Sequence, residues 1–341
     1  MSSTLSARRL YEGRGVYPVG VSCWPPASLA HEHPEDDEER WLDGVRSALK
    51  HGTTLIALAD ICGLGRTERL LSGLWHEVPR ESLQIACAAG HFRGTAPHPY
   101  AAPHLHHQLK QTLENLATDY LDLYVLDHTD FGPGERHLAD AVRPLRAWRD
   151  SGVIRSVGLR VPGDGATADA RRAFRHAQRA LAPDVLVVEY NALTGPVLVD
   201  GTDVFDHAAE RGLPVLVTSP LAHGLLAAPP APRGPVRPPD ADPGHPWFRP
   251  EILAAVREEL RPLRERFGDA ALPGLALRHC LDRSPDVVVL PGFGSPEQIA
   301  LHYAGLDLPV AASDQDLIDA TYAGLRSRTS RVTDSRACDG C

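Results

Sequence analysis

Eight short apolar runs, separated by amphipathic stretches, constrain the fold of this chain more than any other feature. The runs are rich in Val, Ile and Leu, which is typical of parallel strands that are covered on both faces. They occupy Val19–Cys23, Thr54–Ala59, Leu83–Cys87, Asp122–Leu126, Ile154–Leu159, Val185–Glu189, Pro214–Thr218 and Asp286–Leu290. We therefore expect eight strands in a parallel sheet.

Helical patterns follow most of these runs. They cover Asp37–Lys50, Thr67–Leu74, Ala101–Leu116, Ala139–Ser151, Ala168–Ala180, Asp203–Glu210 and Glu251–Phe267. Because the alternation continues without a change of composition between the two halves, it predicts a single (βα)8 TIM barrel over residues 1–326. An open doubly wound sheet is the alternative. Residues 327–341 are predicted to be a polar C-terminal tail without a partner element of its own.

A proline-rich segment interrupts the pattern after the seventh run. Pro229–Pro250 contains nine prolines in 22 residues, so it can form neither a helix nor a central strand. Its position predicts a long loop on the carboxyl-terminal face of the barrel, where TIM-barrel active sites lie. Two interpretations are open, a lid over the site and a variable insertion.

Charge and composition narrow the range of partners. The formal net charge of −9 argues against nucleic acid or an anionic membrane surface. No apolar run reaches the roughly 18 residues of a membrane-spanning helix, and the N-terminus lacks the apolar stretch of a secretory signal. The six cysteines are spread along a long chain, as in a reduced protein. We expect a cytoplasmic protein with a small-molecule substrate, and leave its oligomeric state open.

Five stretches of the chain, in order, resemble the aldo/keto reductase superfamily. They are Gly52–Gly63, Leu113–Tyr124, Ser151–Gly158, Ser219–Leu226 and Ala276–Gln298. The resemblance covers about residues 19–325 and implies a barrel of that family that reduces carbonyl groups with a nicotinamide cofactor. In such enzymes a tyrosine protonates the substrate oxygen, a lysine paired with an aspartate lowers the tyrosine pKa, and a histidine orients the carbonyl.

The chain departs from the family at all four of these catalytic positions. The positions of the aspartate, tyrosine, lysine and histidine match Ala57, Cys62, Ala88 and Asp127. The only two lysines of the chain, Lys50 and Lys110, lie elsewhere in the sequence. We interpret this pattern as the loss of the catalytic tetrad.

The cofactor-binding positions are kept at one end only. Where the family holds the carboxamide and stacks an aromatic ring on the nicotinamide, this chain has Arg160-Val161, Val187 and Thr218. These side chains supply neither the same amide hydrogen bonds nor the same stacking surface. The positions that hold the cofactor phosphates agree better with the family pattern. They are Ser219, Leu221, Gly224, Gly292, Ser295 and Gln298. NADP(H) is therefore a candidate cofactor, although the pattern favours no cofactor.

The ends of the predicted strands bring six candidate catalytic residues to one face, namely Asp60, Cys62, Asp127, His128, Arg160 and Tyr190. In an apolar mouth, Asp127 would have a raised pKa suited to a general acid or base, or it pairs with Arg160 as a structural ion pair. His128 faces inward only if the backbone turns after Asp127. Cys62 is either a nucleophile or a small buried hydrophobe. His91, Glu189 and His223 are expected on the same face without an assigned role.

The C-terminal Cys338 and Cys341 have the spacing of metal ligands but no second pair of Cys or His beside them. They either reach the pocket and bind a metal or belong to an exposed tail.

Our main functional hypothesis is non-redox acid–base chemistry (elimination, isomerisation or cyclisation) on a small polar metabolite. One alternative is an NADPH-dependent oxidoreductase with a relocated proton donor, such as His128 or Asp127. The other alternative is a non-catalytic binding or regulatory barrel.

Overall fold

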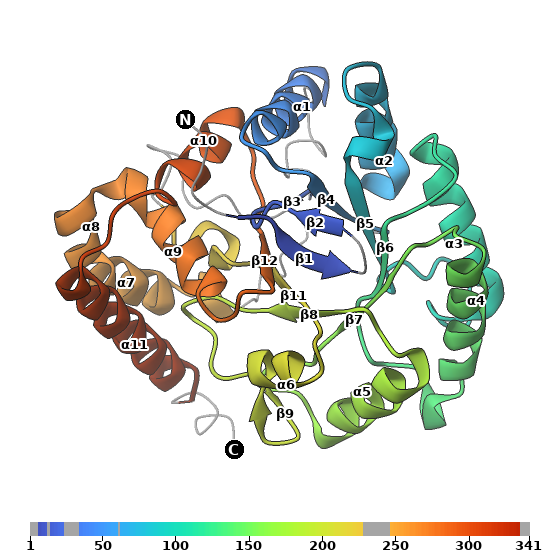
Figure 1. Ribbon diagram of the computed structural model, residues 1–341. Helices are drawn as coiled ribbons and strands as arrows, with labels where there is room; N and C mark the ends of the chain where they lie inside the picture. Colours follow the sequence, from blue (N-terminus) through green and yellow to red (C-terminus); the bar gives the residue numbers. More distant parts are fainter. Residues whose placement is uncertain (1–5, 12–13, 24–33, 61, 228–245, 335–341) are drawn as a thin grey trace.

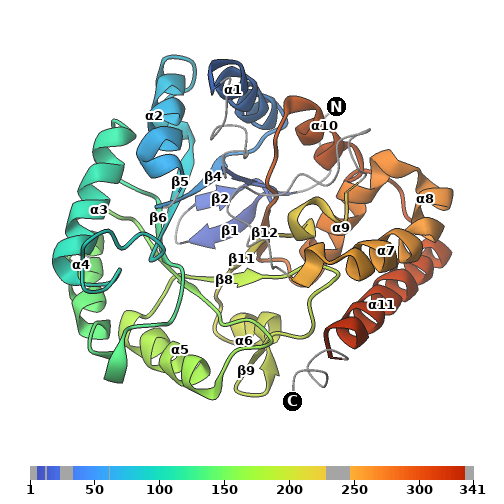
Figure 2. The ribbon, with the colours of Figure 1, turned by 180° about the vertical axis from the view of Figure 1, so that it is seen from behind.

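Eight parallel strands form a barrel that is surrounded by helices (Figures 1 and 2). The computed structural model describes residues 6–11, 14–23, 34–60, 62–227 and 246–334. The barrel strands are β3 (Val21–Ser22), β4 (Leu55–Ala59), β5 (Gln84–Ala89), β6 (Leu123–Leu126), β7 (Val157–Arg160), β8 (Val185–Glu189), β11 (Val215–Thr218) and β12 (Val287–Leu290). The predicted (βα)8 TIM barrel is therefore confirmed.

The first and last strands close the barrel. The sheet order runs from β12 through β11, β8, β7, β6, β5 and β4 to β3. Parallel bridges then join Val19 to Val289 and Ser22 to Gly292. Because these bridges link the two ends of the sheet, the doubly wound alternative, which has two free edges, does not apply.

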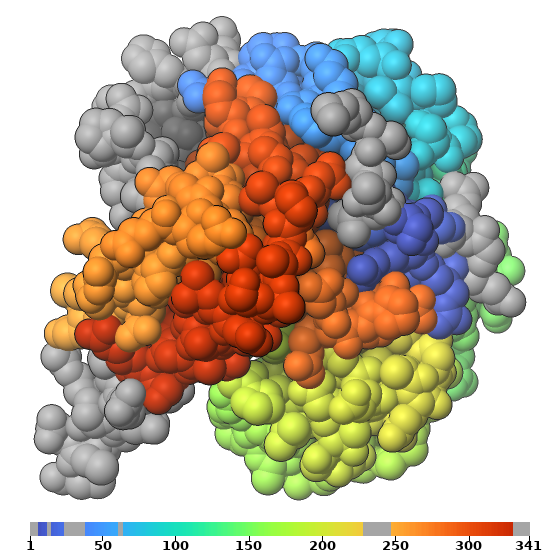
Figure 3. All heavy atoms as spheres, turned by 60° about the vertical axis from the view of Figure 1, so that its left-hand side comes forward, coloured from blue at the N-terminus to red at the C-terminus, as the bar shows by residue number. Residues whose placement is uncertain are grey.

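The helices form the outer layer. Those packed around the strands are α1 (Pro34–Lys50), α2 (Arg66–Ser72), α3 (Ala102–Asn115), α4 (Leu138–Asp150), α5 (Ala168–Leu181), α6 (Val204–Glu210), α9 (Leu272–Leu281) and α10 (Pro296–Ala304). Three more, α7 (Pro250–Glu259), α8 (Arg261–Phe267) and α11 (Ala312–Asp334), cover one side of the molecule (Figure 3). None of the helices in the described ranges combines the length and apolarity that crossing a bilayer demands.

Two helical predictions differ from the structure. The predicted single helix 251–267 is divided into α7 and α8, because Pro262 in the first turn of α8 cannot donate the bond that a continuous helix needs. The predicted boundary at residue 326 falls inside α11, where Thr329 is buried. Cys338 and Cys341 lie outside the described residues, as do residues 229–245 of the proline-rich segment.

Inward-facing apolar side chains fill the barrel. Alternate residues on the strands, among them Leu123, Val125, Val185 and Val187, form one buried cluster inside it. An N-terminal hairpin of β1 (Arg8–Tyr11) and β2 (Arg14–Val16) adds its own apolar residues to this cluster, and it was missing from our sequence predictions. The hairpin lies at the amino-terminal end of the strands, so the carboxyl-terminal mouth is left for the site. A second hairpin pairs β9 (Leu198–Val199) with β10 (Thr202–Asp203).

Candidate active site

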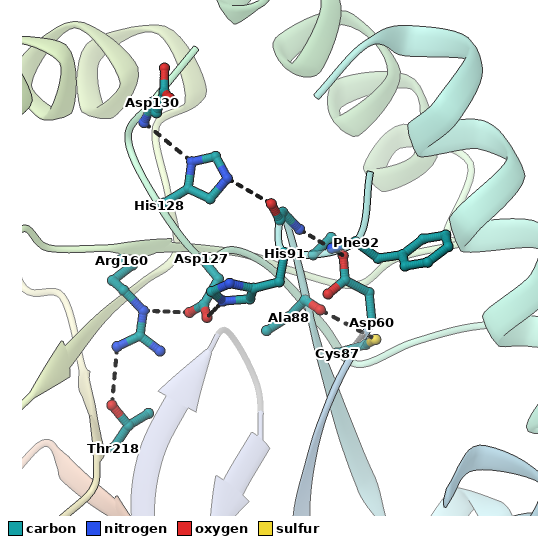
Figure 4. Close-up of polar contacts among 12 residues, drawn as sticks. Asp60, Cys87, Ala88, His91, Phe92, Asp127, His128, Asp130, Arg160 and Thr218 are labelled. Atoms are coloured by element: carbon teal, nitrogen blue, oxygen red, sulfur yellow. Dashed lines mark hydrogen bonds and ion pairs between the residues drawn. The ribbon is translucent and has the colours of Figure 1, made fainter. Parts of the chain in front are cut away.

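A buried carboxylate at the mouth of the barrel, that of Asp127, is contacted by two cationic side chains (Figure 4). Asp127 follows β6 directly and continues the inward-facing positions of Leu123 and Val125. Its Oδ1 atom accepts a hydrogen bond from Nε of Arg160, the last residue of β7. Its Oδ2 atom lies 2.5 Å from Nε2 of His91, in the loop after β5. Both oxygens of the carboxylate are therefore engaged.

The pKa of Asp127 is lowered, which corrects the raised value that we expected. Burial by itself would raise the pKa, but the charge of Arg160 and the hydrogen bonds from His91 and Arg160 outweigh the cost of burial. The carboxylate is therefore ionised at neutral pH. The ion pair with Arg160 that we considered is present, and the same carboxylate also contacts His91.

His91 is the main residue of this site to which our sequence reasoning gave no catalytic role. Its hydrogen bond to Asp127 raises the pKa of the imidazole, more than burial lowers it. The side chain keeps 37% of its surface exposed. The sequence signal that could have identified His91 is its position just after the third barrel strand, because residues at the carboxyl ends of barrel strands form the active site. A partly exposed imidazole whose protonated form is stabilised by a buried carboxylate is suited to proton donation.

Arg160 connects this carboxylate to the neighbouring strands. Its Nη1 atom donates to Oγ1 of Thr218, the last residue of β11, at 3.1 Å. Burial lowers the pKa of Arg160, but the charges of Asp127 and Glu189 raise it by more than burial lowers it. The guanidinium therefore stays charged. Glu189 in turn lies 3.8 Å from Nε2 of His223.

His128 lies beside this group but is bonded to the backbone. Its Nε2 atom is 2.7 Å from the carbonyl oxygen of Gly90, and its Nδ1 atom accepts the backbone N–H of Asp130 at 3.2 Å. The alternation of side chains along a strand turns it away from Asp127. Both ring nitrogens are therefore occupied by main-chain groups.

Asp60 is also bonded to the backbone, immediately after β4. Its Oδ2 atom accepts the N–H groups of Gly90 and Phe92, while its buried Oδ1 atom has no hydrogen-bond partner within the described ranges. Burial raises the pKa of this carboxyl, more than the two backbone bonds lower it. Asp60 is therefore close to His91 in space, although it does not contact Asp127.

Tyr190 is not brought to the mouth. Its ring stacks on that of His279 of α9 at 5.8 Å, and its hydroxyl lies 3.4 Å from the imidazole Nε2. Because Val187 and Glu189 occupy the inward positions of β8, Tyr190 faces the helices. Cys62 lies in a short helical turn, Cys62–Gly65, and its side chain is outside the described part of the structure.

The loop after β11 contains several residues in the left-handed backbone conformation. Ser219, Ala222, His223 and Gly224 all have positive φ, a conformation that costs energy in non-glycine residues. The N–H groups of Ala222 and Gly224 donate to carbonyl oxygens of the same loop, so an anion would bind to the remaining N–H groups of the loop. The amide of Asn191 holds this loop by donating to the Ser219 carbonyl at 3.0 Å.

The N-terminus of α10 provides a second anion-binding edge. Ser295 caps the helix by accepting the N–H of Gln298, and Gln298 in turn accepts the N–H of Gly294 at 2.6 Å. A Cβ atom built on Gly224 or Gly292 would meet only open space, so neither position is blocked. Helix N-termini bind phosphate. Loop and helix together therefore fit the phosphates of a dinucleotide, whereas Val187 belongs to the apolar interior.

Metal ligands do not gather within the described residues. There, no three His, Cys, Asp or Glu side chains are placed to hold a metal ion. The pair Cys338 and Cys341 is outside these residues, so a metal at the C-terminus stays a prediction.

Comparisons with known proteins match nearly the whole chain. The model of the aldo/keto reductase family matches residues 27–323. An NADH-specific methylglyoxal reductase of Escherichia coli is 24% identical, over 88% of this chain and 93% of its own. The structure of a glycerol dehydrogenase from Gluconobacter oxydans aligns with a TM-score of 0.72 at 20% identity, covering 94% of this chain and 96% of the other. The structure of an aldo-keto reductase from Klebsiella pneumoniae in complex with NADPH aligns with a TM-score of 0.65 at 19% identity, covering 94% of this chain and 96% of the other.

The main functional hypothesis, non-redox acid–base chemistry, is wrong. Relatives that match along the chain are reductases and dehydrogenases, and structures of this fold hold NADP or NADPH. Hydride transfer needs a fixed geometry and a proton source, and residues outside the tetrad can provide both. The predicted loss of the tetrad therefore gave no reason to abandon redox chemistry.

The family match covers most of the barrel, from before α1 into α11, and includes every strand from β4 to β12. The closed parallel barrel agrees with it. This chain belongs to the aldo/keto reductase family.

Proposed function

We propose that this enzyme interconverts a small carbonyl compound and its alcohol with NAD(P)H, and that His91 is the proton donor. The observation that carries the proposal is the contact between the His91 imidazole and the buried Asp127 carboxylate at the barrel mouth. The charge of Arg160 keeps that carboxylate ionised. This arrangement is the relocated proton donor of our alternative hypothesis, with His91 in place of Asp127 or His128.

A lysine-activated tyrosine does not account for the chemistry. The family's positions for aspartate and lysine fall on Ala57 and Ala88, which pack against the apolar cluster inside the barrel. Both lysines of the chain lie on outer helices, Lys50 in the last turn of α1 and Lys110 in an exposed pair with Glu114 of α3. We infer that the tetrad is lost and that the proton comes from another group.

NAD(P)H, when bound, would provide the hydride for the carbonyl carbon. Nδ1 of the protonated His91 donates a hydrogen bond to the carbonyl oxygen and transfers its proton as that oxygen gains negative charge. Asp127 holds the opposite ring nitrogen and stabilises the cation before transfer. In the reverse direction, neutral His91 takes the proton of the alcohol.

The phosphate-binding surface consists of the loop after β11 and the N-terminus of α10. Ser219, Leu221 and Gly224 belong to the loop, and Gly292, Ser295 and Gln298 lie at the start of the helix. The N–H groups of Gly224 and Gln298 are bonded within the protein, so the other main-chain N–H groups of this surface, together with the helix dipole, would hold the phosphates.

Dinucleotide binding is the first expected result. Titration of the protein with NADPH and with NADH, followed by cofactor fluorescence, should show saturable binding in the micromolar range for one of them. The same cofactor should be oxidised when short aldehydes and ketones are added. Absence of binding of both cofactors at high micromolar concentration would contradict the proposal.

The pH dependence of the reaction should follow His91. Its pKa is raised above the ordinary value of about 6.5. Because the protonated ring is the donor, kcat/KM for carbonyl reduction should be full below this raised pKa and fall as the pH rises through it. Oxidation of the alcohol, which needs the neutral ring, should rise over the same interval. Profiles of both directions that decline together with increasing pH would exclude His91 as the shared acid and base.

A further inference from the structure

The segment Gly90–Phe92, which carries His91, lies beyond the regular hydrogen bonds of the barrel. β5 ends at Ala89 and α3 begins only at Ala102. The main-chain groups of this segment therefore need partners outside the sheet and the helix. The structure supplies them from side chains of neighbouring segments.

The carboxylate of Asp60 binds the segment on both sides of His91. Its Oδ2 atom accepts the N–H of Gly90 at 2.9 Å and the N–H of Phe92 at 3.1 Å. Both hydrogen bonds converge on the same carboxyl oxygen. One side chain thus fixes the two N–H groups that flank the proposed proton donor (Figure 4).

The imidazole of His128 is bonded to the carbonyl group of Gly90. Its Nδ1 atom accepts the N–H of Asp130, which places the ring proton on Nε2. That Nε2–H donates to the Gly90 carbonyl oxygen at 2.7 Å. The ring is a neutral donor with both nitrogens occupied, so it has no proton to offer a substrate.

Only glycine fits at the point where these bonds meet. Gly90 has φ +131°, a region that side chains with a Cβ rarely adopt. A Cβ atom there would lie 2.6 Å from the Tyr100 hydroxyl and 3.0 Å from the His128 ring. The hydroxyl of Tyr100 also accepts the His128 N–H at 3.0 Å. The turn before His91 is thus enclosed by polar side chains.

We propose that Asp60 and His128 are positioning residues that hold Gly90–Phe92 so that His91 stays hydrogen-bonded to Asp127. They act through His91 and do not touch the substrate. The kinetic consequence rests on the proposed function, whereas the effect on the His91 imidazole does not. Two residues that we first considered as catalytic thereby gain a common role.

The test measures the His91 ring by NMR in the full-length protein. The variants are Asp60→Asn, which removes the charge but keeps the shape, and His128→Ala, which removes the donor. His128→Gln keeps an N–H donor. His106→Gln serves as control because His106 lies on the outside of α3, away from the site, where it bonds to the Ala102 carbonyl and packs against Trp148. Circular dichroism establishes that each variant folds.

In Asp60→Asn and His128→Ala, we expect the pKa of His91 to fall toward its ordinary value. The kcat of reduction should decrease about 10- to 100-fold, as for a small misplacement of a catalytic group. The dissociation constant of NADPH should change little. His128→Gln and His106→Gln should behave as the unmodified protein.

An unchanged pKa of His91 in folded Asp60→Asn and His128→Ala would overturn the positioning role. Because the charge of Asp60 by itself also raises the pKa of His91, the hydrogen bond decides if His128→Ala does not fold: loss of the hydrogen-bonded Nε2–H signal of His91 in Asp60→Asn supports the positioning role, and its persistence overturns that role. If the pKa shifts as expected while the unmodified protein reduces no carbonyl compound, the positioning role is supported and the proposed function fails. The two proposals are therefore tested separately.

Discussion

Replacing His91 by glutamine is expected to lower the kcat of carbonyl reduction by about 10²- to 10⁴-fold, the usual contribution of a general acid. Glutamine keeps an N–H group near the Asp127 carboxylate but has no proton that it can transfer. Because His91 is partly exposed and lies in a loop, the fold should tolerate the change. Steady-state kinetics with a saturating cofactor measures the effect, and cofactor binding should remain.

Two further variants make this prediction specific. Asp127→Asn removes the negative charge that keeps His91 protonated, so it should lower kcat and move the pH profile of reduction to lower pH. His106→Gln is a matched substitution on the outside of α3 and should leave kcat unchanged. Reduction by His91→Gln at the rate of the unmodified protein would exclude His91 as the acid.

Replacing Asp122 by alanine is expected to lower the free energy of unfolding by about 3–5 kcal/mol, the range for breaking a buried ion pair. Asp122 is fully buried at the amino-terminal end of β6. It accepts hydrogen bonds from Arg80 at 3.0 Å, Arg155 at 2.8 Å, the Tyr11 hydroxyl at 3.1 Å and the Ile85 N–H at 2.9 Å. Without the carboxylate, the largely buried Arg80 has no ionic partner.

Chemical denaturation followed by circular dichroism measures this loss of stability. Asp119→Ala, on the exposed turn three residues earlier in the chain, is the control and should change stability by less than about 0.5 kcal/mol. A similar small change for Asp122→Ala would show that the hairpin and the two arginines do not depend on this carboxylate.

The barrel architecture allows the catalytic residues to differ in position while the fold is unchanged. The strands and their apolar interior hold the mouth in place, and the reacting groups are supplied by the residues at and after the strand ends. His91 and Asp127 come from two neighbouring strands, β5 and β6, whose carboxyl ends lie side by side. A proton donor can therefore be placed from a loop without altering the core.

Strand periodicity alone located part of the site. Inward-facing Val125 places Asp127 at the next inward position, and the same rule puts Arg160 at the mouth of the adjacent strand. Applied to β8, the rule also turns Tyr190 outward beside Glu189, as the structure has it. We included Tyr190 among the candidate catalytic residues because of its hydroxyl group, although the alternation of side chains along the strand already predicted that it faces outward.

The sequence by itself determined the parallel barrel, because buried strands and amphipathic helices leave a repeated pattern along the chain. Only the tertiary structure decided the proposed proton donor. His91 and Asp127 are 36 residues apart, and the main chain on either side of His91 is hydrogen-bonded to the side chains of Asp60 and His128. Contacts between loops have no periodic signal, since each depends on where the barrel brings its strand ends together.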